Sequence, residues 1–378
     1  MSQTRSTRVL NGKRYSRKVL LVVDNAPARI ERIHKVVKTL ETQGYVVNVA
    51  YPRGLETLSE YGTVPIVSVG RPPLLHYLVF TLFLFLNLVS NPPDIVHFVS
   101  LPDVAVLGIV LARKLRHFRF VYDRRAAFSV IVEHYHKRLG FLARAVENLA
   151  FNNADAILVV VPAFERELAA FKRKLLFVPN GVSLAEFRPR KVRKRGALTV
   201  LVVAALTYVE GIDVFIKAAR LVRDSEPHAR FVVVGDGESA RELQRLNVAL
   251  QRPVQFAGWV PFERVPLEIN GADICVSCVL PTIFTDYAYP VKLFEYLACR
   301  KPVIVSNIRG HTELVRDEKD GLVYDANSPP DLSRKIIRLI KNRNLRRSLA
   351  ANGYNLAKRY SWETCSAALI RGYERILT

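Results

Sequence analysis

The chain has 378 residues, half of them hydrophobic, and a formal net charge of +22. Its length suits two domains, and its apolar content excludes a generally disordered chain. So large a positive charge indicates an anionic partner: nucleic acid, an acidic membrane surface or a phosphorylated substrate. Because no zinc finger, RNP motif or basic zipper occurs, nucleic acid has only the composition in its favour.

Residues 1–18 carry basic side chains and no acid, which predicts a flexible tail near a membrane or polyanion, or simply a solubilising terminus. Four cysteines and no recognisable signal peptide predict a reducing, cytoplasmic location. Cys275 and Cys278 form a C-x-x-C pair inside an apolar run that predicts a strand. Because residues three apart in a strand face opposite ways, buried small side chains are favoured over zinc or redox use.

The first half of the chain alternates strands and helices. A strand at 19–23, a helix at 29–43 and a strand at 46–49 predict a parallel sheet with a right-handed crossover. Further strands are expected at 94–99, 118–122 and 155–160. His97 lies near the end of one of them, and Asp123 and Arg124 follow the next. Open α/β sheets present ligands at these carboxyl ends.

Residues 74–89 form a nearly uninterrupted apolar run of sixteen residues. This is short of the roughly 18 to 20 that a spanning helix needs. One hypothesis is a helix partly buried in protein and partly dipped into a membrane, which the positive charge favours. The alternative is a helix buried completely in the core.

The second half repeats the alternation after a basic segment, R-P-R-K-V-R-K-R, at 188–195. A strand at 231–234 leads into Gly235-Asp236-Gly237, where glycines allow close approach of the backbone to a ligand. Pro290 suits the first turn of a helix that carries Glu295 and ends before Pro302. A short buried strand is predicted at 303–305, and an amphipathic helix at 362–377.

Several of these segments resemble the family 4 glycosyltransferases, retaining enzymes of the group 1 type with the GT-B fold. They are P-V-K-L-F-E-Y-L-A-C-R-K-P-V-I-V-S at 290–306, F-A-G-W-V at 256–260, D-I-V-H at 94–97 and N-G-V at 180–182. The resemblance implies two Rossmann-like, doubly wound parallel-sheet domains that face a cleft. The implied parts are a basic tail (1–18), an acceptor-side domain (19–187), a basic linker (188–196), a nucleotide-sugar-binding domain (197–360) and a helix that returns to the first domain (361–378).

The same resemblance implies transfer of a hexose from a nucleotide sugar to a lipid-linked or glycan acceptor at the inner face of a membrane. Glu295 would hold the donor ribose, since a carboxylate can accept protons from two hydroxyls. The nucleotide sugar is a substrate, so no cofactor is expected, and no D-x-D motif offers a metal site. The other expected donor-site residues are Arg29, Gly235, Gly237, Trp259, Val260, Asp286, Tyr289 and Lys292, and the expected catalytic residues are His97, Asp123 and Arg124.

The sequence departs from the family where the donor diphosphate is gripped. Ala205 and Glu210 stand in place of two cations, and Tyr287 stands in place of the first glutamate of an E-x7-E pair, with Asp286 one residue away. Other cations could take over, the donor could differ, or the protein could be a non-catalytic partner subunit. A polyanion-binding protein is a further alternative.

Under the first of these interpretations, arginines of the first domain replace the missing cations. The candidates are Arg29, Arg32, Arg124 and Arg125, with Lys292 and Arg309 as further possibilities. Arginine suits this role because it binds phosphate through two parallel hydrogen bonds. The same hypothesis predicts that Glu210 is paired with a neighbouring basic residue.

Overall fold

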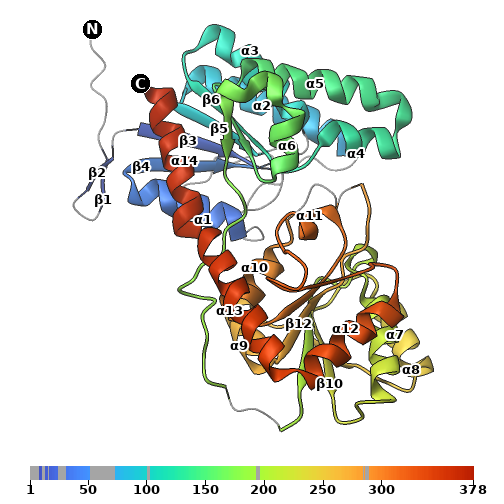
Figure 1. Cartoon of the computed structure of the whole chain (residues 1–378). Helices are drawn as coiled ribbons and strands as arrows, with labels where there is room; N and C mark the ends of the chain where they lie inside the picture. Colours follow the sequence, from blue (N-terminus) through green and yellow to red (C-terminus); the bar gives the residue numbers. More distant parts are fainter. Residues whose placement is uncertain are drawn as a thin grey trace. The chain divides into compact units, whose positions relative to one another are not determined.

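The computed structural model describes residues 8–10, 13–15, 17–23, 31–51, 73–99, 103–192, 196–283, 285 and 289–378. The chain forms two compact units: unit 1 comprises Met1–Pro179 with Ser366–Thr378, and unit 2 comprises Asn180–Cys365. Each unit holds a six-stranded parallel sheet with helices packed on it (Figure 1). The predicted α/β class with two doubly wound sheets is confirmed.

The sheet of unit 1 has the strand order β4-β3-β5-β6-β7-β8. Its strands are β3 (Arg17–Val22), β4 (Tyr45–Ala50), β5 (Ile95–Val99), β6 (Arg119–Arg124), β7 (Ala156–Val159) and β8 (Leu175–Phe177). Every residue of β5 and β7 is buried, as expected for parallel strands covered on both faces. The register pairs His97 with Val121 and Val99 with Asp123, so the side chains of His97 and Asp123 come from adjacent strands.

Helices cover both faces of this sheet (Figure 1). They are α1 (Glu31–Thr42), α2 (Pro73–Ser90), α3 (Val106–Leu115), α4 (Phe128–Tyr135), α5 (Gly140–Asn153) and α6 (Pro162–Glu167). From Ser366 onward, α14 (Trp362–Leu377) also belongs to unit 1. There Tyr373 packs edge-on against Tyr45, and a Cβ on Gly372 would lie 2.3 Å from the Leu176 side chain. The C-terminal residues are thus part of the unit 1 core.

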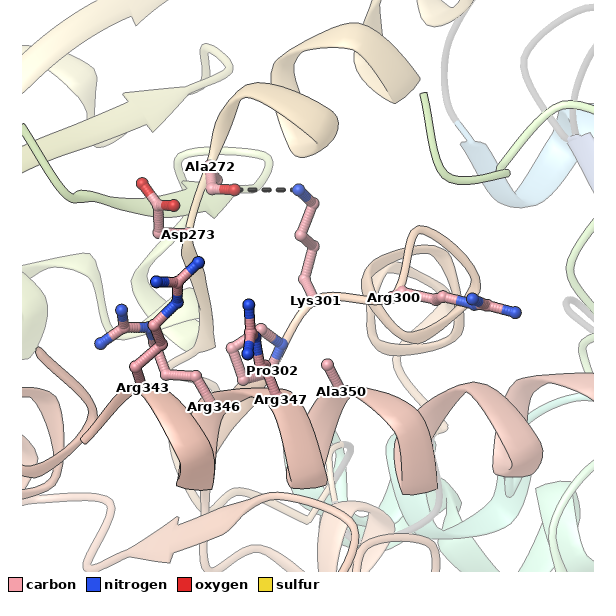
Figure 2. Close-up of a pocket in the computed structure, with 9 residues that line it drawn as sticks. All are labelled: Ala272, Asp273, Arg300, Lys301, Pro302, Arg343, Arg346, Arg347 and Ala350. Atoms are coloured by element: carbon pink, nitrogen blue, oxygen red, sulfur yellow. Dashed lines mark hydrogen bonds between the residues drawn. The ribbon is translucent and has the colours of Figure 1, made fainter. Parts of the chain in front are cut away.

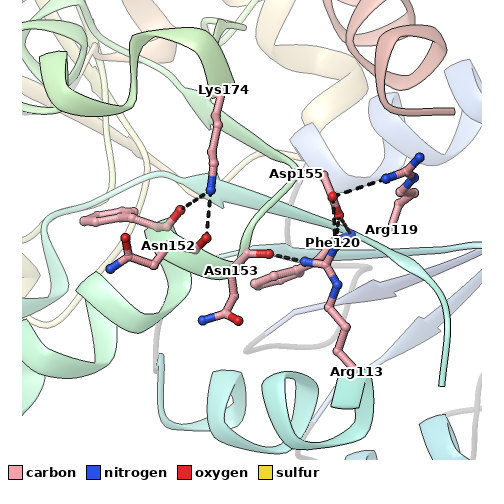
Figure 3. A network of polar contacts seen from close by, with 8 residues as sticks. Arg113, Arg119, Phe120, Asn152, Asn153, Asp155 and Lys174 are labelled. Atoms are coloured by element: carbon pink, nitrogen blue, oxygen red, sulfur yellow. Dashed lines mark hydrogen bonds and ion pairs between the residues drawn. The ribbon is translucent and has the colours of Figure 1, made fainter. Parts of the chain in front are cut away.

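Asp155 anchors the end of α3 to the start of β7 (Figure 3). Its carboxylate accepts two hydrogen bonds from Arg113 Nη2, at 2.8 and 2.7 Å, and one from the Phe120 backbone N–H at 2.7 Å. Arg116 Nε donates to the Val89 carbonyl at 2.8 Å and so joins the ends of α2 and α3. These bonds fix the positions of α2 and α3 relative to the sheet.

The flexible tail predicted for residues 1–18 is wrong for its described part. β1 (Arg8–Leu10) pairs antiparallel with β2 (Lys13–Tyr15), and β3 already begins at Arg17. The sequence between β1 and β2 is Asn-Gly, the strongest short-range signal for a hairpin. That local signal outweighs the basic composition.

The helix predicted at 74–89 is confirmed as α2, and the alternative of a fully buried helix is wrong. Phe80, Leu84 and Leu88 are buried, at 3%, 0% and 0% exposure. On the other side of α2, three leucines four residues apart are about half exposed: Leu78, Leu82 and Leu86. Within the described residues, no helix is long and apolar enough to cross a bilayer.

The sheet of unit 2 has the order β11-β10-β9-β12-β13-β14. Its strands are β9 (Thr199–Val203), β10 (Arg230–Val234), β11 (Gln255–Gly258), β12 (Ile274–Ser277), β13 (Val303–Ser306) and β14 (Leu322–Tyr324). Its helices are α7 (Ile212–Arg223), α8 (Ala240–Ala249), α9 (Val265–Gly271), α10 (Val291–Ala298), α11 (Arg309–Thr312), α12 (Pro329–Lys341) and α13 (Arg343–Arg359). The buried side chains of α7, α8, α12 and α13 form one hydrophobic core with those of the strands.

The cysteine pair and the basic segment of unit 2 both pack against other residues of the unit. Cys275 and Cys278 are free thiols and fully buried, which confirms the packing interpretation; burial raises the pKa of the Cys278 thiol to about 12. In the segment predicted as a basic linker, the Arg190 backbone N–H donates to Asn270 Oδ1 at 2.8 Å. Asn270 Nδ2 in turn donates to the Arg188 carbonyl at 3.0 Å. This part of the segment is therefore bonded to unit 2.

Candidate active site

The glycine loop of unit 2 follows β10 and packs against the loop that follows β9. Gly235 has a φ of 135°, and a Cβ there would lie 1.8 Å from the Ala204 carbonyl oxygen. A Cβ on Gly237 would lie 2.6 Å from the Leu206 carbonyl oxygen. The sequence predicted that these glycines admit a ligand. In the structure, the space beside both glycines is occupied by the backbone of residues 204–206.

Helix α10 carries two of the predicted donor-site residues. Glu295 is buried, at 7% exposure, in the middle of this helix. Lys292 lies one turn earlier and forms an ion pair with Glu210, which ends the short 3-10 helix Tyr208–Glu210. Both side chains are mostly buried, at 13% and 19% exposure. The predicted basic partner of Glu210 is thus confirmed, and it is a residue expected to contact the donor.

A buried histidine that sequence reasoning did not single out joins β12 and β13 next to α10. His311 Nε2 lies 3.0 Å from Ser277 Oγ, and its Nδ1 lies 3.0 Å from both the hydroxyl and the carbonyl oxygen of Ser306. Only a protonated Nδ1 can donate to that carbonyl, so Nε2 accepts from Ser277. Burial, together with the Lys292 charge, lowers the pKa of His311 to about 3, although the hydrogen bond to the Ser306 carbonyl acts in the opposite direction. The imidazole is therefore neutral at physiological pH.

The remaining predicted donor-site residues of unit 2 differ in their surroundings. Tyr289 is buried and donates through its hydroxyl to Glu313 Oε2 at 3.2 Å, while Arg309 Nε donates to Glu313 Oε1 at 3.1 Å. Trp259, just after β11, is 71% exposed, and Val260 beside it is half-buried. Asp286 lies outside the described residues.

In unit 1, His97 and Asp123 belong to a buried polar cluster. His97 Nε2 lies 3.6 Å from Asp123 Oδ2, and His97 Nδ1 lies 2.7 Å from the Tyr373 hydroxyl. Arg32 pairs with Asp123 Oδ2 at 3.4 Å and donates to the Val178 and Pro179 carbonyls at 3.0 and 3.1 Å. Burial would raise the pKa of Asp123, but Arg32 and His97 together lower it to about 2. The carboxylate is therefore ionised at any ordinary pH.

Arg124 faces away from this cluster, because consecutive residues of a strand point to opposite faces. Its guanidinium lies 3.4 Å from Glu147 and 2.9 Å from Glu167, and it sits 4.3 Å from the centre of the Phe164 ring. The Glu147 carboxylate also accepts the Phe128 N–H at the start of α4. The three residues predicted as catalytic thus do not form one group: His97 and Asp123 are together, and Arg124 is elsewhere.

The predicted replacement of the missing cations by arginines of unit 1 finds little support in these contacts. Arg29 lies outside the described residues, and Arg125 is half-buried after β6. Arg32 and Arg124 are 7% and 1% exposed and have protein partners. Either would have to give up these partners in order to bind a diphosphate. Lys292 is a better candidate, because it already lies beside Glu210.

Two doubly wound parallel sheets, each in its own unit, are the architecture of the GT-B class of glycosyltransferases. The family model for glycosyl transferases group 1 matches residues 185–356, and the model for glycosyltransferase family 4 matches residues 31–186. The chain belongs to the group 1 glycosyltransferases of family 4. The resemblance inferred from the sequence motifs is therefore confirmed.

Known proteins similar to the chain include an uncharacterized glycosyltransferase of Methanocaldococcus jannaschii, 28% identical over 60% of this chain and 61% of its own length. The UDP-Gal:alpha-D-GlcNAc-diphosphoundecaprenol alpha-1,3-galactosyltransferase of Escherichia coli is 27% identical over 70% of this chain and 73% of its own. Sucrose-phosphate synthase from Thermosynechococcus elongatus superposes with a TM-score of 0.77 at 18% identity, covering 96% and 99% of the two chains. The last likeness concerns the fold alone.

Proposed function

We propose that this glycosyltransferase is a retaining, metal-independent enzyme. It would move a hexose from a nucleotide-sugar donor to a lipid-linked or glycan acceptor at an anionic membrane surface. The observation that carries the donor half is Glu295, buried on α10 within the residues that match the group 1 model, in a segment that resembles the family's nucleotide-binding segment. The name of the Escherichia coli relative, a galactosyltransferase that acts on a diphosphoundecaprenol-linked sugar, supports both the donor class and the acceptor class.

Glu295 is suited to hold a ribose because an ionised carboxylate only accepts hydrogen bonds, and a ribose offers two neighbouring hydroxyl donors. Bonds from hydroxyls to a charged acceptor are stronger than those to a neutral one. The helix holds the carboxylate in place before the ligand arrives. Less conformational freedom is therefore lost on binding.

For the diphosphate we propose Lys292. Glu210 stands where the family has a cation, but its charge is balanced by Lys292 from α10. A diphosphate that reached this pair would compete with Glu210 for the ammonium group. In a retaining transfer of this kind, the protein has to position the substrates and stabilise the charge that develops on the departing diphosphate. We propose that the exchange of partners by Lys292 supplies part of that stabilisation.

The proposal of a membrane surface is supported by two rows of exposed leucines on unit 1. Leu78, Leu82 and Leu86 of α2 are 50–58% exposed, and Leu107, Leu111 and Leu115 of α3 are 39–62% exposed. The two helices pack side by side, so closely that a Cβ on Gly108 would lie 2.6 Å from the Thr81 carbonyl oxygen. We call these six residues the leucine surface. Two rows of exposed leucines on neighbouring helices are more apolar surface than a protein that faces only water usually exposes in one region.

Basic residues adjoin the leucine surface, and they select the kind of membrane. Lys114 and Arg116 flank Leu115 in the sequence, and both are exposed. Lys137 and Arg138 are exposed next to Leu139 and Phe141, which are 47% and 70% exposed. Exposed leucines can enter the interfacial region while basic side chains contact anionic headgroups, each contributing about 1 kcal/mol. We therefore propose a peripheral location on an anionic leaflet.

The test of the donor site compares Glu295→Gln with Glu263→Gln, an exposed glutamate of unit 2 used as the matched control. Loss of the charged acceptor should weaken UDP binding by about 1–3 kcal/mol in the first variant and leave it unchanged in the second. Isothermal titration calorimetry measures both. Equal affinities for the two variants would contradict the assignment of Glu295.

The reaction itself is tested by transfer of a radiolabelled sugar from UDP-sugars to polyprenyl-diphosphate-linked acceptors, with and without EDTA. We expect turnover that EDTA does not abolish, and a product that keeps the anomeric configuration of the donor, as read by NMR. The missing cations at Ala205 and Glu210 also favour a second candidate, a non-catalytic partner subunit. Binding of UDP without turnover on any sugar donor would support that candidate instead.

A further inference from the structure

A basic pocket lies at one end of two interior strands of the unit 2 sheet, β12 and β13. Asp273 immediately precedes β12, and Lys301 and Pro302 immediately precede β13, so the pocket lies at the amino ends of these strands. Its other wall is the first part of α13, with Arg343, Arg346 and Arg347 (Figure 2). Its volume is about 250 Å³. The predicted ligand positions lie at the carboxyl ends of the strands, so this is a separate site.

Two of the cations in this pocket are held in place by backbone carbonyl groups. Lys301 Nζ donates to the Asn270 and Ala272 carbonyls at 2.8 and 2.9 Å. Arg346 Nη1 donates to the Leu339 carbonyl and, at 2.7 Å, to the Ile340 carbonyl. A guanidinium has five N–H donors, so Arg346 keeps donors for a ligand, and Lys301 contributes a fixed positive charge. Their positions do not have to be fixed anew when a ligand binds.

Two further cations have no partner in the part of the chain that the structure describes. Arg343 and Arg347 are exposed, and neither guanidinium has a hydrogen bond or ion pair to a described residue. Arg300 also lines the pocket, but its side chain points the other way, over the Tyr354 ring at 4.2 Å (Figure 2). The pocket's single carboxylate, Asp273, accepts the Thr199 N–H at 3.0 Å. Positive charge therefore exceeds negative charge in this pocket.

The arrangement of these charges is unfavourable without an anion. The first turn of α13 contains no acidic residue, although a helix N-terminus already carries partial positive charge. Burial lowers the pKa of Arg346, and repulsion from Arg343 lowers it further, while Asp273 acts in the opposite direction. A bound anion would relieve the repulsion between the arginines. The volume is below the roughly 300–1,000 Å³ of pockets for drug-sized ligands, so it suits a small group.

We propose that this pocket binds a phosphate or diphosphate group, at a site separate from the donor site. Arginine guanidinium groups match phosphate oxygens in pairs, and Arg343 and Arg347 lie four residues apart, on the same side of α13. Lys301 and Arg346 supply fixed charges beside them. The group could belong to a free phosphorylated compound or to the headgroup of an anionic lipid. The inference does not depend on glycosyl transfer.

The test uses Arg343→Gln/Arg347→Gln and, as a control with the same change of charge, Arg245→Gln/Arg252→Gln on exposed arginines elsewhere in unit 2. Pyrophosphate is titrated into each protein by calorimetry, with and without UDP, because UDP would displace pyrophosphate from the donor site only. We expect binding that persists with UDP present and is weakened at least tenfold in the first variant alone. UDP affinity should be equal in all three proteins.

Co-sedimentation with vesicles of phosphatidylglycerol or phosphatidylcholine separates the two sources of phosphate. A lipid headgroup is indicated if the first variant binds phosphatidylglycerol vesicles less than the control does, and a free compound if only the pyrophosphate titration differs. The proposal is overturned if the two variants behave alike in both assays, or if UDP abolishes all pyrophosphate binding. Loss of UDP binding in Glu295→Gln would leave this result unaffected, so the two proposals fail independently.

Discussion

Each of the two units has its own sheet of six parallel strands, but their charged groups have different surroundings. In unit 1 Arg32, His97 and Asp123 form one buried cluster, and the buried Arg124 pairs with the buried Glu147 and the partly exposed Glu167. In unit 2 the Lys292–Glu210 pair keeps part of its surface exposed, and Arg343 and Arg347 are open to solvent.

This difference separates charges that hold the fold from charges that can meet a ligand. A buried pair has lost its hydration, so removing one partner leaves an uncompensated charge. A pair that water still reaches can exchange its partner for a ligand at lower cost, because water partly compensates each group. Unit 1 adds the leucine surface on α2 and α3. We therefore expect mutations of charges to affect stability in unit 1 and binding in unit 2.

The largest expected effect is that of Asp123→Asn, which keeps the shape of the side chain and leaves Arg32 without its counter-charge. The free energy of unfolding should fall by about 3–5 kcal/mol. The control is Asp213→Asn, which breaks the exposed pair with Lys217 and should cost less than about 1 kcal/mol. Hydrogen exchange of the unit 1 strands for Asp123→Asn, and of the unit 2 strands for Asp213→Asn, measures the two losses. Equal losses for the two variants would remove the distinction drawn between the units.

The second expected effect is a different response of the units to acid. His311 has a pKa of about 3 in the folded protein against 6.5 for the free side chain, so below pH 6.5 the unfolded state binds a proton that the folded state does not. The free energy of unfolding of unit 2 should then fall by about 1.4 kcal/mol for each pH unit as the pH drops from about 6 to 4. Asp123, with a folded pKa of about 2, contributes stability that is lost only below about pH 4.

Tryptophan fluorescence can follow this response selectively, because both tryptophans, Trp259 and Trp362, belong to unit 2. Urea unfolding at a series of pH values gives the slope of the unfolding free energy against pH. His311→Gln should reduce this slope by the contribution of about one proton. Hydrogen exchange of unit 1 should show no corresponding change between pH 6 and 4. A slope that is the same in the variant would show that His311 is not the group responsible.

Some features of these regions could be predicted from the sequence, and others could not. The strand and helix order, the α10 segment and the burial of Cys275 and Cys278 all follow from local patterns of apolar residues, which is why they could be predicted. The partners of a charged side chain depend on residues far away in the sequence. Arg32 meets the Val178 and Pro179 carbonyls across more than 140 residues, and no local pattern specifies that contact.

His311 and the Lys292–Glu210 pair illustrate the same limit. The sequence shows a histidine shortly after a strand, but only the fold brings Ser277 next to it. Glu210 was recognised as an anomaly against the family pattern, and a basic partner was expected for it. That the partner is Lys292 follows from the packing of α10 beside the loop after β9. An anomaly in a motif can thus be detected in the sequence, whereas its compensation is found in the fold.

The third expected effect concerns the leucine surface. Leu82→Glu/Leu111→Glu removes two half-exposed leucines, each contributing about 1 kcal/mol on entering a membrane interface. Binding to phosphatidylglycerol vesicles at high salt should weaken roughly 30-fold, by co-sedimentation. The control Leu221→Glu/Val248→Glu changes exposed apolar residues of unit 2 and should bind as the natural protein does. Binding that is unchanged in the first variant, or is equal for phosphatidylcholine, would contradict the membrane proposal.

The smallest expected effect tests whether Lys292 exchanges Glu210 for the diphosphate. Glu210→Gln removes the competing carboxylate, so UDP should bind more tightly by up to about 1 kcal/mol, while Lys292→Gln should weaken UDP binding. Uridine, which lacks the diphosphate, should bind all three proteins equally in calorimetry, and this confines the effect to the phosphate groups. Glu210→Lys would place two ammonium groups together, so it should destabilise unit 2 unless UDP is present. If Glu210→Gln binds UDP no better than the natural protein does, Lys292 stays with Glu210 in the complex. The charge of the diphosphate must then be met by residues outside this pair.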